Sequence, residues 1–213
     1  SIYKTKKIIL ALGLEPKELD KAFAKRFLGR GVSYYAQGDF AAYRNEDVVV
    51  IGGGNCACYA AEYLANVVKK VTLIHQSNSL KAVQSLKDKI LACGNINIMW
   101  DSEVIDIFGI DQIEKVKIQH TITQQHTWLD AKAVFVYIGR IPPKQIISPE
   151  IDVDENGFII TDDFMRTNIP GVYAIGDIRS KQVRQIASAI SDGMLAAINT
   201  ERDLSRIIPP STL

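Results

Sequence analysis

The chain contains only three cysteines among its 213 residues, Cys56, Cys58 and Cys93. Their number and spacing exclude a disulfide framework and a four-ligand zinc site, and we expect no metal centre. An excess of either charge is also absent, because 25 basic residues balance 24 acidic ones and the net charge is +1. We therefore expect no nucleic-acid partner.

Long hydrophobic runs are missing as well. No apolar stretch approaches the ~20 residues of a membrane span, and the chain begins at Ser1 without a signal-peptide pattern. We expect no membrane partner and a location in the reducing cytoplasm. The absence of an initiator methionine suggests a trimmed or cleaved chain.

What the sequence does have is one glycine-rich stretch, residues 47–57, which reads DVVVIGGGNCA. Its apolar residues suit a strand buried on both faces of a parallel sheet. Gly52 permits a tight turn, Gly54 lets the backbone approach a pyrophosphate, and the small Ala57 lets helix and strand pack closely. A helix that begins near Asn55 would direct its first N–H groups at the phosphates. This pattern predicts a dinucleotide site, with a purely structural glycine turn as the alternative.

Strands and helices alternate after this stretch. We expect strands at residues 70–75 and 95–100 with a helix at 80–92 between them, as in the mononucleotide-binding half of a doubly wound sheet. Residues 103–138 change to short, alternating segments typical of an antiparallel meander, and residues 133–139 form a buried strand. The predicted fold class is α/β, a Rossmann-like three-layer domain with an antiparallel meander.

The two ends of the chain carry weaker signals. Residues 5–13 predict a short strand, residues 17–25 a short amphipathic helix, and residues 32–39 a loop or short strand. Two adjacent prolines at 142–143 mark a boundary.

Beyond that boundary we expect a hairpin turn at residues 155–157, a buried strand at 171–177 and a long helix at 182–203. The apolar positions of this helix recur at helical spacing, at Ile186, Ala189, Ile190, Met194, Leu195 and Ile198.

Short motifs spread along the chain agree with one family in their order and spacing. They are ALG at 11–13, GRGVSY at 29–34, VIGGGNCA at 50–57, LIH at 73–75, IGRIPP at 138–143, and IPGVYAIGD at 169–177 followed by Arg184-Gln185. On these motifs the chain resembles the thioredoxin reductase family of flavin-dependent pyridine nucleotide oxidoreductases. The resemblance implies FAD and either NADPH or NADH as cofactors, and a homodimer.

The resemblance also implies a nicotinamide-nucleotide domain inserted into the sequence of an FAD domain. We expect residues 14–141 to be the NAD(P)H-binding domain. Residues 1–13 would end the first segment of the FAD domain, and residues 142–213 would be its C-terminal segment, part of a second Rossmann-like domain. Only one glycine fingerprint is present, whereas the family has an earlier one for FAD. The chain is therefore expected to be a fragment, or a protein that has lost half of its flavin site.

The chain departs from the family at the redox dithiol. The family's Cys-x-x-Cys pair forms and breaks one disulfide, and Tyr35 and Gly38 occupy those positions here. We therefore predict no catalytic residue and no thioredoxin reduction by dithiol exchange. Cys56 and Cys58 cannot replace the pair, because side chains two apart on a helix diverge, and we expect both to be small buried residues.

A second departure concerns the choice of nicotinamide nucleotide. Members that prefer NADPH carry two arginines after the histidine that matches His75, whereas this chain has Gln76 and Ser77, with Lys81 in place of a third basic residue. No acid favours NADH either, so we expect weak discrimination or impaired binding of both. His75 alone could equally be a strand-end histidine satisfied by backbone. Gly139, in IGRIPP, is the remaining residue predicted to bind a cofactor.

The flavin half matches the family better. Asp177, preceded by Gly176, resembles the aspartate that bonds the flavin ribityl chain, and Arg184 and Gln185 resemble the pair beside the flavin ring. The alternative is an ordinary Gly-Asp turn and a solvated Arg-Gln pair.

A third departure from the family lies just after the glycine-rich stretch. Tyr59 and Ala60 stand where the family usually has two acids, one of them near the nicotinamide.

These residues leave several functions open. The resemblance implies an enzyme that passes electrons from NAD(P)H through flavin to a redox protein, which is thioredoxin-like, a ferredoxin or a flavodoxin. A cysteine-less relative of the fold serves as a ferredoxin or flavodoxin reductase. A chain degenerate at several sites could instead be a non-catalytic nucleotide-binding or dimerisation module.

Overall fold

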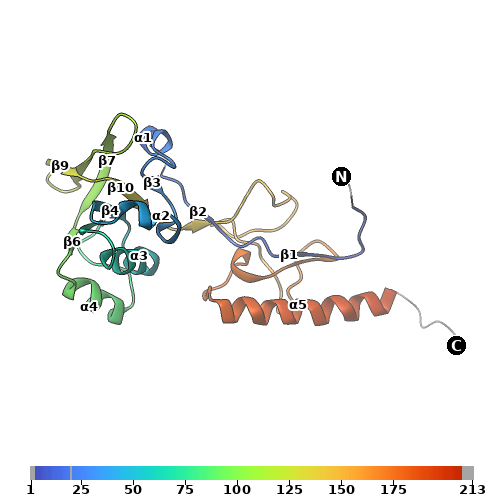
Figure 1. The fold of residues 1–213 in the computed structure, drawn as a ribbon. Helices are drawn as coiled ribbons and strands as arrows, with labels where there is room; N and C mark the ends of the chain where they lie inside the picture. Colours follow the sequence, from blue (N-terminus) through green and yellow to red (C-terminus); the bar gives the residue numbers. More distant parts are fainter. Residues whose placement is uncertain (1–2, 20, 208–213) are drawn as a thin grey trace. The chain divides into compact units, whose positions relative to one another are not determined.

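The computed structural model describes residues 3–19 and 21–207, and it divides the chain into two compact units. The terminal unit joins residues 1–15 to residues 140–213, and the inserted unit holds residues 16–139 (Figure 1). Two short strands, β2 (Glu15–Pro16) and β11 (Arg140–Ile141), pair where the chain passes between the units. The assignment of each unit to one cofactor stays a prediction.

A five-stranded parallel sheet forms the centre of the inserted unit, in the order β3-β10-β4-β5-β6. Its strands are β3 (Val32–Ser33), β4 (Asp47–Ile51), β5 (Lys70–Ile74), β6 (Ile96–Met99) and β10 (Ala133–Val136). The predicted parallel strands are thereby confirmed. In register, Val50 of β4 lies between Phe135 of β10 and Leu73 of β5.

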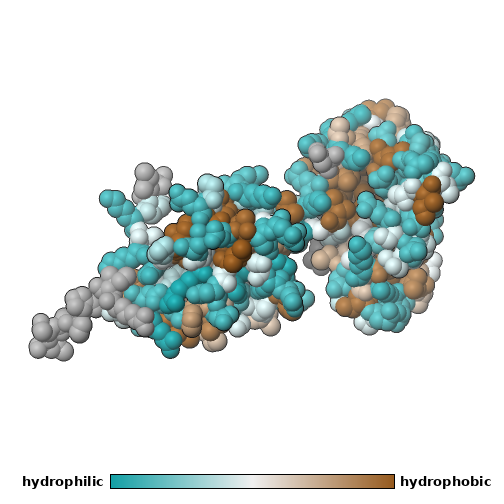
Figure 2. Space-filling model, turned by 180° about the vertical axis from the view of Figure 1, so that it is seen from behind, coloured by the Kyte–Doolittle hydropathy of each residue, from teal (hydrophilic) through white to brown (hydrophobic). Residues whose placement is uncertain are grey.

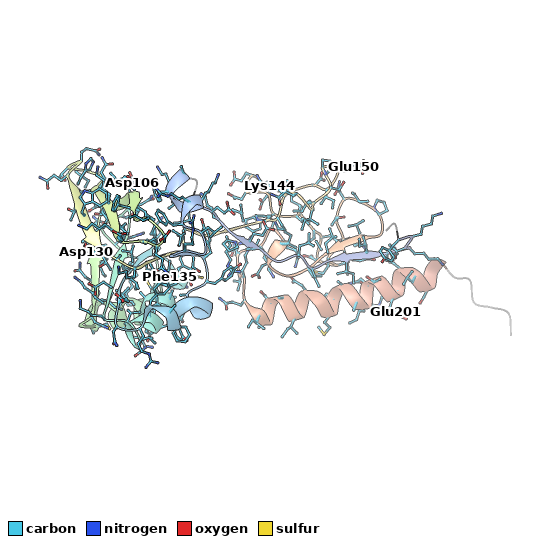
Figure 3. All side chains as sticks on the ribbon, turned by 45° about the horizontal axis from the view of Figure 1, so that its top comes forward. Asp106, Asp130, Phe135, Lys144, Glu150 and Glu201 are labelled. Carbon is cyan, nitrogen blue, oxygen red and sulfur yellow. The ribbon has the colours of Figure 1, made fainter. Side chains whose placement is uncertain are left out.

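Both faces of this sheet are buried at its centre, which is why β4 from Val48 to Ile51 and β10 from Ala133 to Val136 are apolar without interruption. Val48 and Val50 point into the core formed with α3 (Asn55–Ala65) and α4 (Gln84–Ala92), whereas Val49 and Ile51 point into the opposite core. Phe135, labelled in Figure 3, is fully buried in the first of these cores.

The second face is covered by the predicted antiparallel meander and by α1 (Ala22–Arg26). The meander consists of β7 (Ser102–Phe108), β8 (Lys115–His120) and β9 (His126–Asp130). Its inward residues, among them Val104, Val116 and Ile118, pack against β4 and β10. The unit is therefore three-layered, as expected: helices, parallel sheet and antiparallel sheet.

Three local predictions were wrong in detail. Residues 32–39 contain a helix, α2 (Ala36–Asp39), which continues into the 3-10 helix η1 (Phe40–Tyr43). The Ala36 N–H donates to the Tyr137 hydroxyl at 2.9 Å, a tertiary contact that no local pattern reveals. The helix α4 begins at Gln84 instead of residue 80, and α1 begins at Ala22 instead of residue 17.

The terminal unit is built on two parallel strands, β1 (Ile8–Leu10) and β12 (Val172–Ala174), followed by the 3-10 helix η2 (Gly176–Ile178) and the long α5 (Ile186–Ile207). The predicted turn at 155–157 is present, but its flanks pair through a single antiparallel bridge. The Asp154 carboxylate closes this turn by accepting the N–H groups of Asn156 and Phe158.

Four of the six apolar positions predicted for α5 lie on its exposed face, whereas Ala189 and Leu195 are half-buried. Ile186, Ile190, Met194 and Ile198, four residues apart along the helix, are exposed by 81%, 68%, 57% and 42%. The buried face carries Asp192, Ala196 and Asn199 instead. Figure 2 shows apolar patches on the surface of this unit. Among the described residues, no helix combines the length and apolar content needed to cross a membrane.

Candidate functional site

We call the glycine-rich turn and helix start of residues 52–57 the cradle. The fold itself requires its first glycine. Gly52 has φ +140°, and a Cβ there would lie 2.4 Å from the Tyr137 carbonyl oxygen and 2.9 Å from the Ala57 Cβ. Its N–H donates to the Ile74 carbonyl at 3.0 Å. Gly52 and the small Ala57 therefore let α3 start directly above the sheet, as the sequence pattern predicts.

Gly54, in contrast, has open space in front of it. It is the N-cap of α3, with extended backbone, and a Cβ built there would meet no atom within 4 Å. The first N–H groups of α3 are thus accessible, which fits a pyrophosphate at the helix N-terminus. The Asn55 side-chain oxygen accepts the Val83 N–H at 2.9 Å and ties the cradle to the segment before α4.

His75 supports the cradle from within the fold. Its ring is buried, its Nε2 lies 3.0 Å from the Ser79 carbonyl oxygen, and a Cβ on Gly53 would come within 2.3 Å of it. Burial lowers the pKa of His75 and outweighs the bond to Ser79. The ring is therefore neutral at neutral pH and contributes no positive charge to the cradle. These contacts match the alternative of a strand-end histidine satisfied by backbone.

The rim beside His75 offers little charge. Gln76 is exposed and Ser77 is half-buried, while Lys81 is exposed and its N–H donates to the Gly53 carbonyl at 2.7 Å. Gly139 has φ +115°, and its carbonyl accepts the Lys17 N–H. Whether these residues contact a nucleotide stays a prediction.

The two residues predicted to stand in place of the family's dithiol lie at one short helix. Tyr35 is the N-cap of α2 and is 59% exposed, and Gly38 lies within that helix. Neither residue has a group that exchanges with a disulfide. On α3, Tyr59 is exposed and Ala60 is buried.

The cysteines differ from one another in exposure. Cys58 is buried, and burial raises the pKa of its thiol to about 11, whereas Cys56 is exposed, so the expectation that both are buried was wrong for Cys56. A helix turns about 200° over two residues, which places them on opposite faces of α3. Cys93 is half-buried, and its Sγ donates to the Asn95 side chain at 3.2 Å.

This difference predicts selective alkylation. In the folded protein at mildly alkaline pH, iodoacetamide should modify Cys56 at least about tenfold faster than Cys58, because the thiolate is the nucleophile. Peptide mapping after a timed quench measures both rates. Denatured protein is the control, in which the two rates should converge. Equal rates in the folded protein would contradict the burial of Cys58.

A second site lies within the terminal unit. All four predicted flavin residues, Gly176, Asp177, Arg184 and Gln185, line one pocket of about 430 Å³, together with Gly13 and other residues. No described residue donates a hydrogen bond to the Asp177 carboxylate, which leaves it available to a ligand hydroxyl. The pocket therefore fits part of a dinucleotide.

Arg184 is held by the protein itself. Its Nε donates to the Asp177 carbonyl and its Nη2 to the Arg179 carbonyl, both at 3.1 Å. Its guanidinium also lies 3.8 Å from the centre of the Phe158 ring. Arg184 thus supports the backbone that presents Asp177. The backbone N–H of Gln185 donates to the Ser188 hydroxyl at 3.2 Å.

Sequence reasoning missed the polar network beneath this pocket. Asp192 is buried on α5 and binds Gly176, Arg179 and Lys181. The sequence does contain one signal of this network: Asp192 is a charged residue within a helix that was interpreted from its apolar positions.

Comparison with known proteins identifies the family of the chain. A family model described as pyridine nucleotide-disulphide oxidoreductase matches residues 1–193. The chain belongs to this family. A 34.2 kDa protein in the rubredoxin operon of Clostridium pasteurianum is 39% identical over 201 residues, which make up 94% of this chain and 65% of that protein.

Two thioredoxin reductases place the chain more narrowly. The enzyme of Listeria innocua is 38% identical over 202 residues, 94% of this chain and 63% of that protein. The crystal structure of Lactococcus lactis thioredoxin reductase matches with a TM-score of 0.90 at 37% identity, over 95% of this chain and 67% of that one. Membership of the thioredoxin reductase family and the α/β fold class are thereby confirmed. The chain spans less than two thirds of the length of the C. pasteurianum and L. innocua relatives. FAD and NADPH are the cofactors of this family.

Proposed function

We propose that the chain belongs to an FAD-dependent NAD(P)H oxidoreductase, with the nicotinamide nucleotide bound by the inserted unit and FAD by the terminal unit. The observation that carries this proposal is the gathering of Gly176, Asp177, Arg184 and Gln185 around one pocket. The open cradle at Gly54 supports the nicotinamide half. FAD would accept hydride from the nicotinamide and pass electrons onward.

The onward transfer does not use a dithiol of this chain. Tyr35 and Gly38 are the residues that the family resemblance puts at the positions of the redox pair, and Cys56 and Cys58 lie on opposite faces of α3. The acceptor is accordingly a protein that takes electrons directly from flavin, such as a ferredoxin or flavodoxin, with a thioredoxin-like protein as the alternative. A homodimer follows from the family resemblance.

An acceptor assay tests this route. With FAD and NADPH or NADH supplied, the chain should reduce ferricyanide but should not reduce a thioredoxin disulfide above background. Reduction of thioredoxin would contradict a route without the dithiol. Failure with every acceptor would favour the second candidate, a non-catalytic nucleotide-binding module, which the changed residues Gln76, Ser77, Tyr59 and Ala60 favour.

The cradle rim predicts weak discrimination between nicotinamide nucleotides. We expect dissociation constants for NADPH and NADH within about tenfold of each other, because each missing charge-assisted bond removes roughly 1.5–3 kcal/mol from NADPH binding. Lys81→Ala should remove the remaining preference for NADPH. Lys89→Ala is the control. Lys89, on α4, pairs with Glu62 of α3 at 2.9 Å, and its substitution should leave the ratio unchanged. A strong NADPH preference in the unaltered chain would refute this expectation.

A further inference from the structure

A buried carboxylate lies directly behind the pocket of the terminal unit. Asp192, on the second turn of α5, is only 7% exposed. It accepts three hydrogen bonds: from the Gly176 N–H at 3.0 Å, from Arg179 Nη1 at 2.7 Å and from Lys181 Nζ at 2.9 Å. All three donors belong to residues 176–181, the segment that follows β12 and carries Asp177.

This segment needs an external constraint. Gly176 has φ +77°, and the three residues of η2 form only a single short turn. Asp192 holds the segment from the side of α5, and Arg184 holds it through the carbonyls of Asp177 and Arg179. The Nε of Arg179 also donates to the Thr161 hydroxyl at 2.7 Å. The segment is thus fixed at both its backbone and its side chains.

The charges argue for a role beyond general stability. One carboxylate faces two cations, Arg179 and Lys181, whose side chains are 12% and 13% exposed. Burial by itself raises the pKa of Asp192, but the hydrogen bonds from Lys181, Arg179 and Gly176 outweigh it and lower that pKa. Burying such a cluster costs desolvation energy that an apolar contact would avoid, and buried ion pairs are therefore a poor source of net stability. Such a cluster suits a role in fixing one conformation of residues 176–181.

We propose that Asp192 is a positioning residue for the pocket, which keeps residues 176–181 against α5 so that Gly176 and Asp177 face the bound cofactor. The identity of that cofactor as FAD rests on the proposed function; the positioning itself does not.

Two substitutions at Asp192 and one matched control test the proposal. Asp192→Leu removes every acceptor, whereas Asp192→Asn keeps one oxygen for the Gly176 N–H, removes the charge and replaces the other oxygen, which accepts from Arg179, with an NH2 group that cannot accept. Asp203→Asn is the control: it changes a second carboxylate of α5, one that binds Tyr173 and Arg166 and does not line the pocket.

Hydrogen exchange of the cofactor-free chain is the first readout, and the dissociation constant for FAD is the second. In Asp192→Leu the amides of residues 176–178 should exchange about tenfold faster or more, since local opening sets the exchange rate. Its FAD dissociation constant should rise by a similar factor. Asp192→Asn should recover much of the Gly176 protection, and Asp203→Asn should change neither readout.

Unchanged exchange at residues 176–178 in Asp192→Leu would overturn the proposal, as would equal effects of Asp203→Asn. If the unaltered chain does not bind FAD, the proposed function fails, while the exchange data still decide the positioning role. If circular dichroism shows that Asp192→Leu does not fold, Asp192→Ala, which also removes every acceptor but introduces a smaller side chain, decides in its place. Faster exchange at residues 176–178 then supports the proposal, and unchanged exchange overturns it.

Discussion

Gly52→Ala should destabilise the inserted unit by about 3 kcal/mol, whereas Gly54→Ala should leave it folded and weaken nicotinamide-nucleotide binding about tenfold or more. At Gly52 the added methyl meets a backbone oxygen 2.4 Å away, and φ is +140°, so neither neighbour nor backbone can adjust cheaply. At Gly54 the methyl enters open space, the space that a pyrophosphate would occupy.

Urea unfolding and nucleotide titration separate the two effects. Gly54→Ala should cost only about 1 kcal/mol, because alanine is a poor N-cap. Gly94→Ala is the control, since a Cβ there also meets no atom within 4 Å and Gly94 lies away from the cradle residues. Nucleotide binding unchanged by Gly54→Ala would contradict a dinucleotide cradle and favour the purely structural turn.

Asp177→Asn should raise the dissociation constant for FAD by about 10- to 100-fold. The reason is that the variant loses one charge-assisted hydrogen bond, which is worth roughly 1.5–3 kcal/mol. Folding should be unaffected, because no described residue donates to this carboxylate and the pocket leaves it accessible. Titration of FAD fluorescence measures the affinity. Asp163→Asn, an exposed carboxylate outside the pocket, is the control. Equal affinity in the two variants would show that Asp177 does not contact the ligand.

The central strands of the parallel sheet could be predicted because their residues are apolar on both faces, and this pattern is local. The side chains of Val48 to Ile51 point alternately into two cores, and each one packs against apolar residues of its own core. The glycine cradle was predictable for a related reason: the turn at Gly52 excludes every side chain, so the sequence records it directly.

The long helix shows why other features could not be predicted. Periodicity identifies an apolar stripe on α5, but it does not say whether that stripe faces the described core. Ile186 and Ile190 are exposed, and the inward face holds Asp192. Similarly, the N–H of Ala36 is bound by Tyr137, 101 positions later, and such a contact is invisible to local pattern.

The candidate site residues also divide into those that a local motif predicts and those whose role depends on tertiary contacts. The four residues predicted to bind flavin gather around one pocket, because Gly176 and Asp177 follow a strand and Arg184 and Gln185 precede a helix. The role of Arg184 needed the structure, since it binds two backbone carbonyls that the motif does not mention. For His75 the sequence left two alternatives open, and its contact with the Ser79 carbonyl matches the one in which backbone satisfies the ring.

The central claim is that one chain offers sites to both FAD and a nicotinamide nucleotide. The most direct test incubates the purified chain with FAD, removes unbound flavin and adds NADPH or NADH without oxygen, while flavin absorbance is recorded. We predict a yellow protein whose flavin band bleaches on addition of either nucleotide. A chain that stays colourless after incubation with FAD, or a yellow one that neither nucleotide bleaches, would contradict the claim.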